Sequence, residues 1–542
     1  MNDPVREVSQ AVAETASALR GAGSVGSPSL ERPKKPDFGD YSTNAAMLLA
    51  PNLGAPPRDV AERLGEALGE RLGEAVDRVE VAGPGFLNLF MSDSWYSAAV
   101  GGVLAAGDSY GAGDPTAGER IGIEFVSANP TGPVTVASGR HAAYGDSLAR
   151  ILTLAGNRVE REYYVNDQGS QIDRFVASIR AWAKGEEPPP DGYRGAYVGE
   201  IAAAIDGAAE AADDDLARRG VELMLEGVRA TLERFRVRMD RFSHERELCE
   251  SGAVAAVLDR LEEREQVYPL DGAVWLRTTT FGDDKDRVLM RSTGELTYFA
   301  PDIALHADKR ARGYDRVIDV WGADHHGYVA RTRAAWQALG GDPERLEVLI
   351  MQLVNLLEGG QRAQMSKRQG EFVSLDDLID DIGVDATRWF VLQRSHDTTL
   401  DLDLELARRQ SQDNPVYYAQ YAHARIASIL RKAAHERVQV ALEADIAHSS
   451  EQLHPSARAL VKRLLEFPEE VRDAADKRAP HRMTTYVTET AQAFSAFYRD
   501  CKVVGAAEEG GDEDLRIAMC EATRRVIARG LDLLGVEAPD EM

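Results

Sequence analysis

The sequence predicts a multidomain protein in which an α/β core lies between a small α+β module and an all-α carboxyl-terminal domain. At 542 residues the chain is long enough for about three domains, because a single hydrophobic core stops growing at roughly 250–300 residues. Strand and helix patterns alternate in the middle of the chain, whereas helical spacing dominates after Leu400. We expect domains at residues 1–112, 113–398 and 399–542, with a helical insertion at about 177–270 in the second.

The composition is that of a globular protein with an acidic balance. Hydrophobic residues make up 44% of the chain and charged residues 28%. The net charge of −26 argues against a nonspecific nucleic-acid binder, although a local basic stripe would still allow a specific one. No apolar run suits a bilayer and no signal peptide is visible, so we expect a cytoplasmic protein without membrane contact. Three widely spaced cysteines indicate neither a disulfide framework nor a zinc site.

The amino-terminal part has the pattern of a small α+β module. Its first residues place an apolar side chain at every helical turn, from Val5 to Leu19, which predicts an opening helix. Residues 45–50 predict a second helix behind polar turn residues. Residues 79–90 alternate as strands do and contain a Gly-Pro-Gly break.

Residues 121–156 organise the core. Ile121, Ile123 and Phe125 predict a strand, an irregular Gly/Pro turn follows, and an apolar helical stripe ends at Gly156. A strand, a turn and a helix in this order are typical of a nucleotide-binding unit of Rossmann type. The exposed N–H groups of such a unit suit phosphate. An ordinary crossover turn is the alternative.

A second ligand-binding turn is predicted further along the core. Residues 316–321 form an apolar run typical of a buried parallel strand, and Gly322-Ala-Asp-His-His-Gly327 is the turn after it. Open α/β sheets bind ligands at the carboxyl ends of their strands, so Asp324 or His325 could meet ribose hydroxyls. Adjacent residues on one turn chelate a metal poorly, and we therefore expect no metal site.

Two further stretches carry candidate chemistry. Residues 361–372 form a polar, Gly-bounded loop whose Ser366, Lys367 and Arg368 could reach a triphosphate, although an exposed basic loop is the alternative. Residues 413–426 predict a helix on which tyrosines could stack on bases. Packing between helices is the alternative role for each tyrosine.

These stretches resemble the signatures of one family. The run ANPTGPVTVASGRHAAYGD resembles the first signature of class I aminoacyl-tRNA synthetases, and specifically of arginyl-tRNA synthetases. The loop QMSKRQG is similar to the second signature, with Gln364 in the place of its first lysine. Residues 413–426 resemble the helical anticodon-binding domain, and residues 39–44 a stretch of the amino-terminal domain that touches the tRNA elbow. Three motifs in the family's order make the resemblance specific.

The resemblance implies an arginine–tRNA ligase. Such an enzyme joins L-arginine to ATP, releases pyrophosphate, and transfers arginine from the adenylate to tRNA(Arg). We expect ATP to enter with Mg²⁺, no tightly bound cofactor, and a monomer. A guanidinium prefers carboxylates that match its planar fork of N–H donors, and Glu124 and Asp302 are the candidates. Glu124 could instead be a buried salt-bridge partner.

The resemblance also assigns roles to individual residues. Glu124, Tyr298 and Asp302 would hold the arginine side chain, and Asn129 its α-amino and carboxylate end. The residues implied in catalysis are Thr135, Ser138, Ser366, Lys367 and Arg368. Those implied in ATP binding are Pro130, Thr131, Gly132, Pro133, Ala137, Gly322, Asp324, His325 and Met365. Those implied in tRNA binding are Tyr41, Asn44, Tyr417, Tyr421 and Arg425.

The first signature departs from the family in one respect. The two histidines of its tetrad are replaced, because Thr135, Val136, Ala137 and Ser138 stand in their place. Hydroxyl groups can donate hydrogen bonds to phosphate but cannot carry positive charge. Arg140 and His141 are candidates for partial compensation.

This departure leaves two interpretations. One is an active enzyme with a variant tetrad, and the other is a non-catalytic tRNA-binding paralogue. The intact Ser-Lys-Arg loop, the pocket carboxylates and the tRNA-type domains favour the active enzyme. The two tRNA-type domains argue against a transferase that would carry arginine to a small acceptor.

Overall fold

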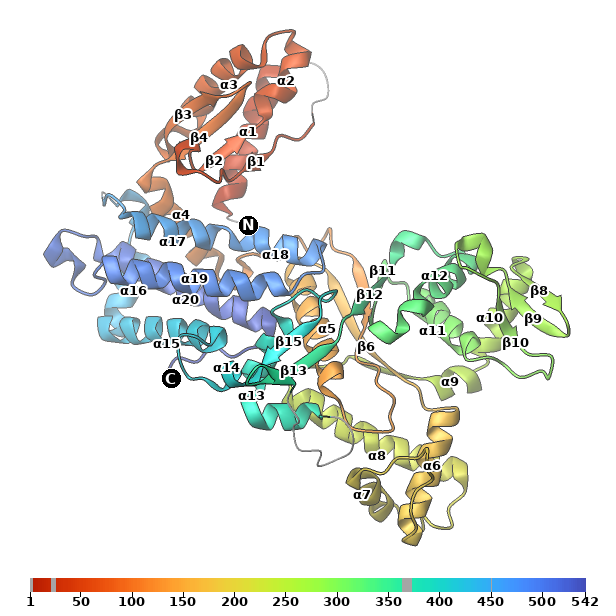
Figure 1. The fold of residues 1–542 in the computed structure, drawn as a ribbon. Helices are drawn as coiled ribbons and strands as arrows, with labels where there is room; N and C mark the ends of the chain where they lie inside the picture. Colours follow the sequence, from red (N-terminus) through yellow and green to blue (C-terminus); the bar gives the residue numbers. More distant parts are fainter. Residues whose placement is uncertain (1–2, 21–25, 363–372, 450) are drawn as a thin grey trace.

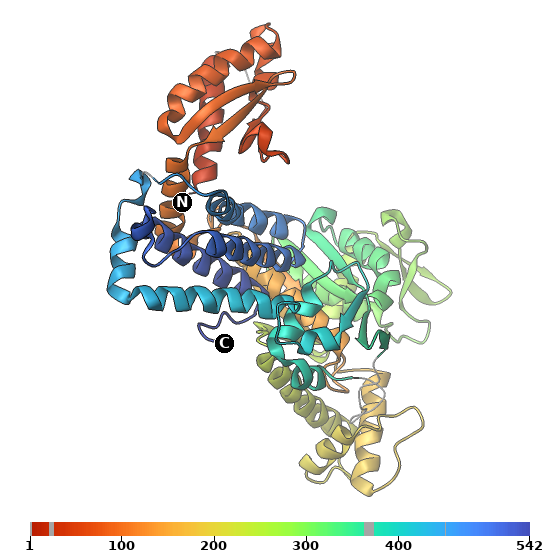
Figure 2. The same cartoon turned by 60° about the vertical axis from the view of Figure 1, so that its left-hand side comes forward.

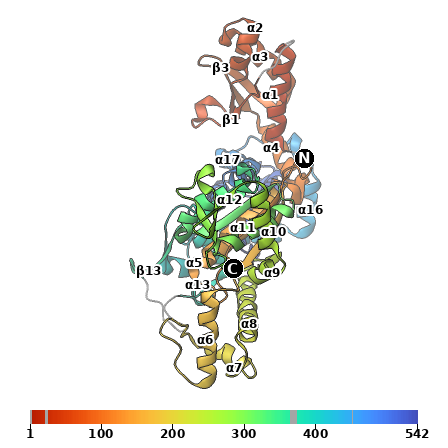
Figure 3. The ribbon, with the colours of Figure 1, turned by 90° about the vertical axis from the view of Figure 1, so that its right-hand side faces the viewer.

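The computed structural model describes residues 3–20, 26–362, 373–449 and 451–542. Within them the chain forms an amino-terminal module, a central parallel sheet with its insertions, and a carboxyl-terminal helical domain (Figure 1). The module and the helical insertion project from opposite ends of the molecule (Figure 3). The predicted fold class is confirmed by this arrangement. Among the described residues, no helix combines the length and the apolar character needed to cross a membrane.

The amino-terminal module is an antiparallel sheet covered by helices. Its strand order is β1 (Leu30–Glu31), β2 (Tyr41–Thr43), β4 (Phe86–Met91) and β3 (Val76–Ala82). Three helices pack together against it, namely α1 (Pro4–Arg20), α2 (Ala45–Leu53) and α3 (Pro57–Leu72). The next helix, α4 (Asp93–Ala106), packs instead against the carboxyl-terminal helices α17 (Pro455–Leu465) and α20 (Glu513–Leu534).

The central sheet has five parallel strands, and its order reverses in the middle. The order is β12 (Leu346–Met351), β11 (Arg316–Gly322), β5 (Arg120–Glu124), β6 (Arg158–Val165) and β7 (Arg241–His244). From β5 the chain builds outward through β6 and β7, and it then returns to place β11 on the other side of β5. Ligands bind at such a switch point, outside the carboxyl ends of the strands.

The insertions differ from the helical stretch predicted at about 177–270. After β6, the helices α6 (Ser170–Lys184), α7 (Ala196–Ala204) and α8 (Asp213–Arg234) form a projecting unit. The chain then returns to the sheet as β7, which the sequence analysis missed because Arg241-Phe-Ser-His is short and not uniformly apolar. Helices α9 (Glu245–Glu250) and α10 (Ala253–Glu263) lead to a second insertion. It is an antiparallel sheet in the order β10 (Arg287–Met290), β9 (Ala273–Leu276) and β8 (Val267–Leu270).

Three helices complete the core around the sheet. They are α5 (Val136–Leu154) between β5 and β6, α11 (Phe299–Ala311) before β11, and α12 (Val329–Ala338) before β12. A 3-10 turn, η5 (Ala323–Tyr328), joins β11 to α12. A small sheet follows in the order β14 (Gln361–Arg362), β13 (Val354–Glu358) and β15 (Leu400–Asp403). Helices α13 (Leu375–Leu392) and α14 (Leu404–Arg408) flank β15.

The carboxyl-terminal domain is helical, as predicted, and lies along one side of the core (Figure 2). Besides α17 and α20 it contains α15 (Pro415–Ala433), α16 (His435–Glu443), α18 (Phe467–Asp476) and α19 (His481–Asp500). One apolar core runs from the amino-terminal module through the central sheet into these helices. The domains therefore pack as one body rather than hanging on loose linkers.

Candidate active site

The turn after β5 is strained and held by tyrosines from neighbouring elements. Val126 and Ser127 both have positive φ, at 69° and 38°, which is unfavourable for residues other than glycine. The Tyr163 hydroxyl donates to the Ala128 carbonyl at 2.7 Å, and the Tyr197 hydroxyl donates to the Thr131 carbonyl at 2.8 Å. These bonds fix the Pro130–Pro133 segment over the carboxyl end of β5.

The variant tetrad opens helix α5. Thr135 is its amino-terminal cap, because its Oγ1 accepts a hydrogen bond from the Ser138 N–H at 3.2 Å. The Thr135 hydroxyl also donates to Ser138 Oγ at 3.2 Å. Ala137 is exposed and Ser138 is half-buried. The first turn of α5 therefore presents hydroxyl and N–H groups at the switch point.

The second signature falls at residues 363–372, which lie outside the described residues, so Met365, Ser366, Lys367 and Arg368 have no described position. The chain that follows them is described. The Val136 N–H donates to the Val373 carbonyl at 3.2 Å, and the Leu375 N–H donates to the Val134 carbonyl at 2.7 Å. Since Val373 is bonded to the tetrad, the carboxyl end of the loop is attached beside the start of α5.

Neither compensating residue supplies a free positive charge. The Arg140 guanidinium is buried and donates to the carbonyls of Gln352, Ser395 and Thr398 at 2.8, 2.9 and 3.0 Å. The hypothesis that Arg140 meets phosphate charge is therefore wrong. Burial, and then the nearby Arg140 charge, lowers the pKa of His141 to about 4. His141 is neutral at physiological pH and can act only through hydrogen bonds.

The expected ATP residues gather where α5 meets the end of β11. A Cβ on Gly322 would lie 2.5 Å from Asp324 Oδ1 and 3.6 Å from the His141 ring, so the backbone at the end of β11 lies close to both side chains. Asp324 and His325 are exposed on η5. Sequence reasoning missed Leu353, which is 62% exposed just beyond β12 at the same edge of the sheet. Its position at the end of an apolar run that predicts a strand could have indicated a residue at the carboxyl edge of the sheet.

Three carboxylates surround a buried hydroxyl on the other side of β5. Asp302 lies in the first turn of α11, Glu245 in the first turn of α9, and Glu124 at the end of β5. Burial, and then the charges of Glu245, Asp302 and Glu124, raises the pKa of the Tyr164 hydroxyl on β6, which lies beside Glu245. Among the residues that the structure describes, no side chain forms an ion pair or hydrogen bond with the Asp302 carboxylate.

Burial shapes the charge of these carboxyl groups. It raises the pKa of Asp302 to about 6 and the pKa of Glu245 to about 7, and neighbouring carboxylates add to both shifts. Glu245 was not predicted, because it follows the short edge strand that the sequence pattern concealed. A group of carboxylates in a buried setting suits a cation.

The Glu124 carboxylate has partners of its own within the protein. It forms an ion pair with Lys309, and its Oε1 accepts a hydrogen bond from the Ser127 hydroxyl at 2.9 Å. Lys309 also pairs with Asp319 at 2.7 Å, and Asp319 lies 2.8 Å from His306 Nε2. Glu124 is thus a buried salt-bridge partner, as its alternative role required. It also forms the floor of the carboxylate group.

Tyr298 and Asn129 are the other two residues implied in arginine binding. Tyr298 is 65% exposed, and its ring Cε1 would lie 3.0 Å from a Cβ on Gly169. Asn129 is exposed in the turn after β5, where its carbonyl accepts the Thr131 N–H at 2.8 Å. Their predicted roles remain predictions.

The tRNA-binding prediction for Tyr41 is wrong. Its ring is 3% exposed and packs edge-on against Trp95 at 6.0 Å, so no base can stack on it. Asn44 uses its amide oxygen to accept the Ser29 N–H at 2.9 Å. The exposed aromatic of this module is Phe38, beside Lys34 and Lys35, in a surface hollow of about 460 Å³.

The aromatic helix α15 presents the expected side chains together. Tyr417 and Tyr421 stack with ring centroids 6.3 Å apart and planes 9° apart. The Arg425 guanidinium lies over Tyr421 at 5.9 Å and over Tyr498 at 4.6 Å. Tyr421 and Arg425 are exposed, which leaves a stacking and cationic surface available.

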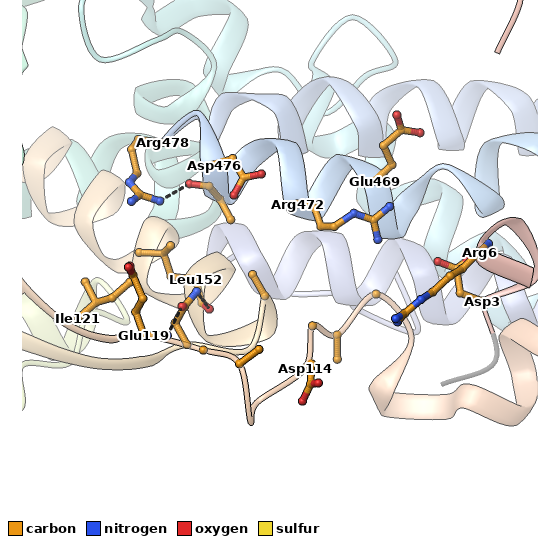
Figure 4. A pocket seen from close by; sticks show the side chains of 18 of the residues that line it. Asp3, Arg6, Asp114, Glu119, Ile121, Leu152, Glu469, Arg472, Asp476 and Arg478 are labelled. Carbon is orange, nitrogen blue, oxygen red and sulfur yellow. Dashed lines mark hydrogen bonds between the residues drawn. The ribbon is translucent and has the colours of Figure 1, made fainter. Parts of the chain in front are cut away.

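A larger cavity lies at the wrong edge of the sheet for this chemistry. It measures about 920 Å³ and lies between α1, the linker at residues 111–119 and α18 (Figure 4). Ion pairs of Glu347 with Arg316 and Arg478 line it, at 2.8 and 2.9 Å. Because it meets the amino ends of β5 and β11, it is not the candidate active site.

Comparison with known proteins agrees with this fold and its order of domains. Residues 6–91 match the arginyl tRNA synthetase N terminal domain, residues 207–428 the catalytic domain of tRNA synthetases class I (R), and residues 419–542 the DALR anticodon binding domain. The switch-point site and these domains define a class I aminoacyl-tRNA synthetase.

Solved structures narrow the class. A Campylobacter jejuni chain assigned as an arginyl-tRNA synthetase is 33% identical, with 83% of this chain and 100% of that chain covered and a TM-score of 0.77. The chain belongs to the arginyl-tRNA synthetase family and is an arginine–tRNA ligase. The non-catalytic alternative is not favoured.

Two more distant structures share the fold. For the Thermus thermophilus arginyl-tRNA synthetase the identity is 24%, the coverage 99% of this chain and 100% of that chain, and the TM-score 0.76. For the Plasmodium falciparum enzyme the identity is 15%, the coverage 99% of both chains, and the TM-score 0.73.

Proposed function

We propose that the pocket bounded by Asp302, Glu245 and Glu124 holds the arginine side chain. The single observation that carries the proposal is the group of carboxylates around the buried Tyr164 hydroxyl. Asp302 and Glu245 would accept the N–H donors of the guanidinium, and Glu124 would close the floor. Tyr298 would cover the side chain from the solvent side, and Asn129 would bind the α-amino and carboxylate end.

ATP would lie at the neighbouring edge, where α5 begins. The Pro130–Pro133 turn, Ala137 and the hydroxyls of Thr135 and Ser138 would meet the phosphates, helped by the amino-terminal end of the helix dipole. Gly322, Asp324 and His325 would meet the ribose, and exposed Leu353 offers an apolar surface for adenine. The loop attached at Val373 would bring Met365, Ser366, Lys367 and Arg368 to the same place.

These positions support in-line attack. An arginine carboxylate oxygen forms a bond to the α-phosphorus, and the bond from that phosphorus to the pyrophosphate oxygen breaks. The terminal ribose hydroxyl of tRNA(Arg) then attacks the adenylate carbonyl, and AMP leaves. Lys367 and Arg368 would stabilise the charge that develops on the phosphates. ATP would enter as its magnesium complex, and among the described residues no cluster of His, Cys, Asp or Glu is arranged to hold a metal ion.

The remaining partners follow from the other domains. We place the tRNA elbow on the Lys34, Lys35 and Phe38 surface, and the anticodon on Tyr417, Tyr421 and Arg425 of α15. Base stacking and cationic contact need no overall positive charge, so the net charge of −26 is compatible with a specific tRNA complex. We propose that the enzyme acts as a monomer in the cytoplasm.

Arginine-dependent pyrophosphate exchange tests the pocket. Asp302→Asn and Glu245→Gln remove charge with little change in shape, and each is expected to raise KM for arginine at least tenfold, because a buried donor that loses its partner costs about 1–3 kcal/mol. KM for ATP should stay within about twofold. Glu247→Gln, at an exposed position on the same helix α9, is the matched control. Equal changes in both KM values would disprove the pocket assignment.

A further inference from the structure

The turn at residues 166–169 contacts two of the proposed arginine-binding residues, although neither is near it in sequence. It joins β6 to α6 and consists of Asn166, Asp167, Gln168 and Gly169. Glu245 enters from the end of the adjacent strand β7, and Tyr298 precedes α11. No step of the reaction assigns a role to this turn, so its contacts with these two residues need another explanation.

Asp167 holds the backbone on both sides of Glu245. Its buried carboxylate lies with Oδ2 2.8 Å from His244 Nδ1, and its Oδ1 accepts the Arg246 N–H at 2.9 Å. The register of the sheet explains this contact, because Val165 pairs with His244 in neighbouring parallel strands. The hydrogen bond from Asp167, followed by its charge, also raises the pKa of His244. Glu245 is therefore held between two residues that one carboxylate fixes.

Asn166 contacts the Glu245 carboxylate directly. In the amide orientation that satisfies its surroundings, Asn166 Nδ2 donates to Glu245 Oε2 at 2.8 Å and to the Gln168 carbonyl at 3.3 Å. The direction of the Glu245 side chain is thus set by Asn166, and its backbone by Asp167.

Gly169 makes room for Tyr298. Its φ of 82° lies in the left-handed region that favours glycine. A Cβ there would lie 3.0 Å from Tyr298 Cε1 and 3.5 Å from its hydroxyl oxygen, so a larger residue would displace the ring. The exposed Tyr298 ring therefore rests on the bare backbone of this turn.

We propose that the turn of Asn166, Asp167, Gln168 and Gly169 is a positioning element that sets selectivity for the guanidinium side chain. Asp167 and Asn166 hold Glu245 in place, and Gly169 seats Tyr298. The inference rests on the proposed arginine pocket, and it concerns residues that act through Glu245 and Tyr298 rather than by binding arginine. If the turn were purely structural, substitutions in it would lower stability and would change KM for arginine and KM for ATP alike.

Double-mutant cycles in pyrophosphate exchange test this inference. Asp167→Ala should raise KM for arginine about tenfold and lower the preference for arginine over lysine, with KM for ATP within twofold. Asp167→Asn should leave KM for arginine close to its wild-type value, because an amide can keep both hydrogen bonds. In a Glu245→Gln background, Asp167→Ala should add less than about twofold, since both changes act through one side chain.

A second double-mutant cycle, with a matched control, tests the contact between Gly169 and Tyr298. Gly169→Ala should raise KM for arginine several-fold, and its effect should disappear in a Tyr298→Ala background. Gly185→Ala is the control, because Gly185 also has positive φ, at 72°, ends the same helix α6, and has no neighbouring atom within 4 Å of where a Cβ would lie. That control should leave both KM values unchanged.

The outcomes separate this inference from the pocket itself. If Glu245→Gln and Tyr298→Ala leave KM for arginine unchanged, the pocket assignment fails and the positioning proposal fails with it. If those variants raise KM but Asp167→Ala and Gly169→Ala do not, or their effects add fully, the pocket stands and the positioning proposal is wrong. Should Asp167→Ala not fold, His244→Ala removes one of the two bonds at a partly exposed residue and should raise KM for arginine by a smaller factor.

Discussion

Arg388 and Asp146 form an ion pair of 2.6 Å in which neither side chain is exposed to solvent. Asp146 lies in the middle of α5, whose first turn carries the tetrad, and Arg388 lies on α13. Arg388 also donates to the carbonyls of Leu534 and Phe235 at 2.7 and 2.8 Å. One buried guanidinium therefore joins the catalytic helix to the last helix of the carboxyl-terminal domain.

Removing this guanidinium should destabilise the whole protein. Arg388→Ala leaves two buried carbonyls without donors and weakens the pairing of a buried carboxylate, which typically costs about 3–5 kcal/mol. Denaturant unfolding measures the loss. Arg150→Ala removes another partner of Asp146, at 2.8 Å, but one that is partly exposed. Its cost should stay near or below about 1 kcal/mol, and equal losses in the two variants would contradict the role given to Arg388.

Arginine binding should depend on pH in a defined direction. The pKa of Asp302 is raised to about 6 and that of Glu245 to about 7 in the free protein, chiefly by burial. A bound guanidinium favours the ionised forms, so binding releases protons and KM for arginine should fall as pH rises from about 5 to 7, then level off. The cations that face Asp302 are His306, Arg331 and Lys309, and their charges oppose the rise in its pKa.

The same linkage affects stability. Because both carboxyl groups bind protons more tightly in the folded state than when unfolded, they stabilise the free protein at low pH, and this contribution is lost as pH rises through 6–7. Saturating arginine should therefore raise Tm more at pH 8 than at pH 5.5. A Tm shift that is the same at both pH values would contradict the assignment.

Lys367 should act on phosphate in the transition state. Lys367→Ala is expected to lower kcat in pyrophosphate exchange about a hundredfold or more, with little change in KM for arginine, because its charge is needed only as pyrophosphate leaves. Lys285→Ala, at an exposed lysine of the second insertion, is the control and should be neutral. A collapse of arginine affinity in Lys367→Ala would show that the loop has another role.

The tetrad should tolerate restoration of its histidines without a large gain. Thr135 already caps α5, and a helix cap is worth about 1 kcal/mol, so Thr135→His with Ser138→His loses a local contact as it adds imidazoles. We expect kcat to stay within about tenfold of the wild-type value. A wild type with negligible exchange and a double mutant that recovers it would instead identify a paralogue that had lost only these residues.

The sequence predicted the switch-point strands because their signals are local. Residues 121–156 and 316–322 are apolar runs ended by turn residues, and these patterns survive in any parallel sheet. The sequence pattern did not predict Glu245, because the strand before it has only four residues and lies at the sheet edge. It did not predict β15, because Leu400–Asp403 is equally short. Short strands are defined by their neighbours, which a sequence pattern does not contain.

Burial explains the two residues whose predicted roles failed. Arg140 was a candidate to meet phosphate charge, but carbonyls from two distant segments converge on it. Tyr41 was implied in tRNA binding, but Trp95, on a helix beyond the sheet, covers it. Both contacts join residues that are far apart in the sequence, so they depend on the tertiary fold rather than on local pattern.

The most direct test of the account is charging of tRNA(Arg) with arginine by the wild-type protein. The site described above predicts that hydroxyl groups at Thr135 and Ser138, with Lys367 and Arg368 on the phosphates, sustain an ordinary turnover number, on the order of 1–10 per second. Tight binding of tRNA(Arg) without detectable charging would contradict it.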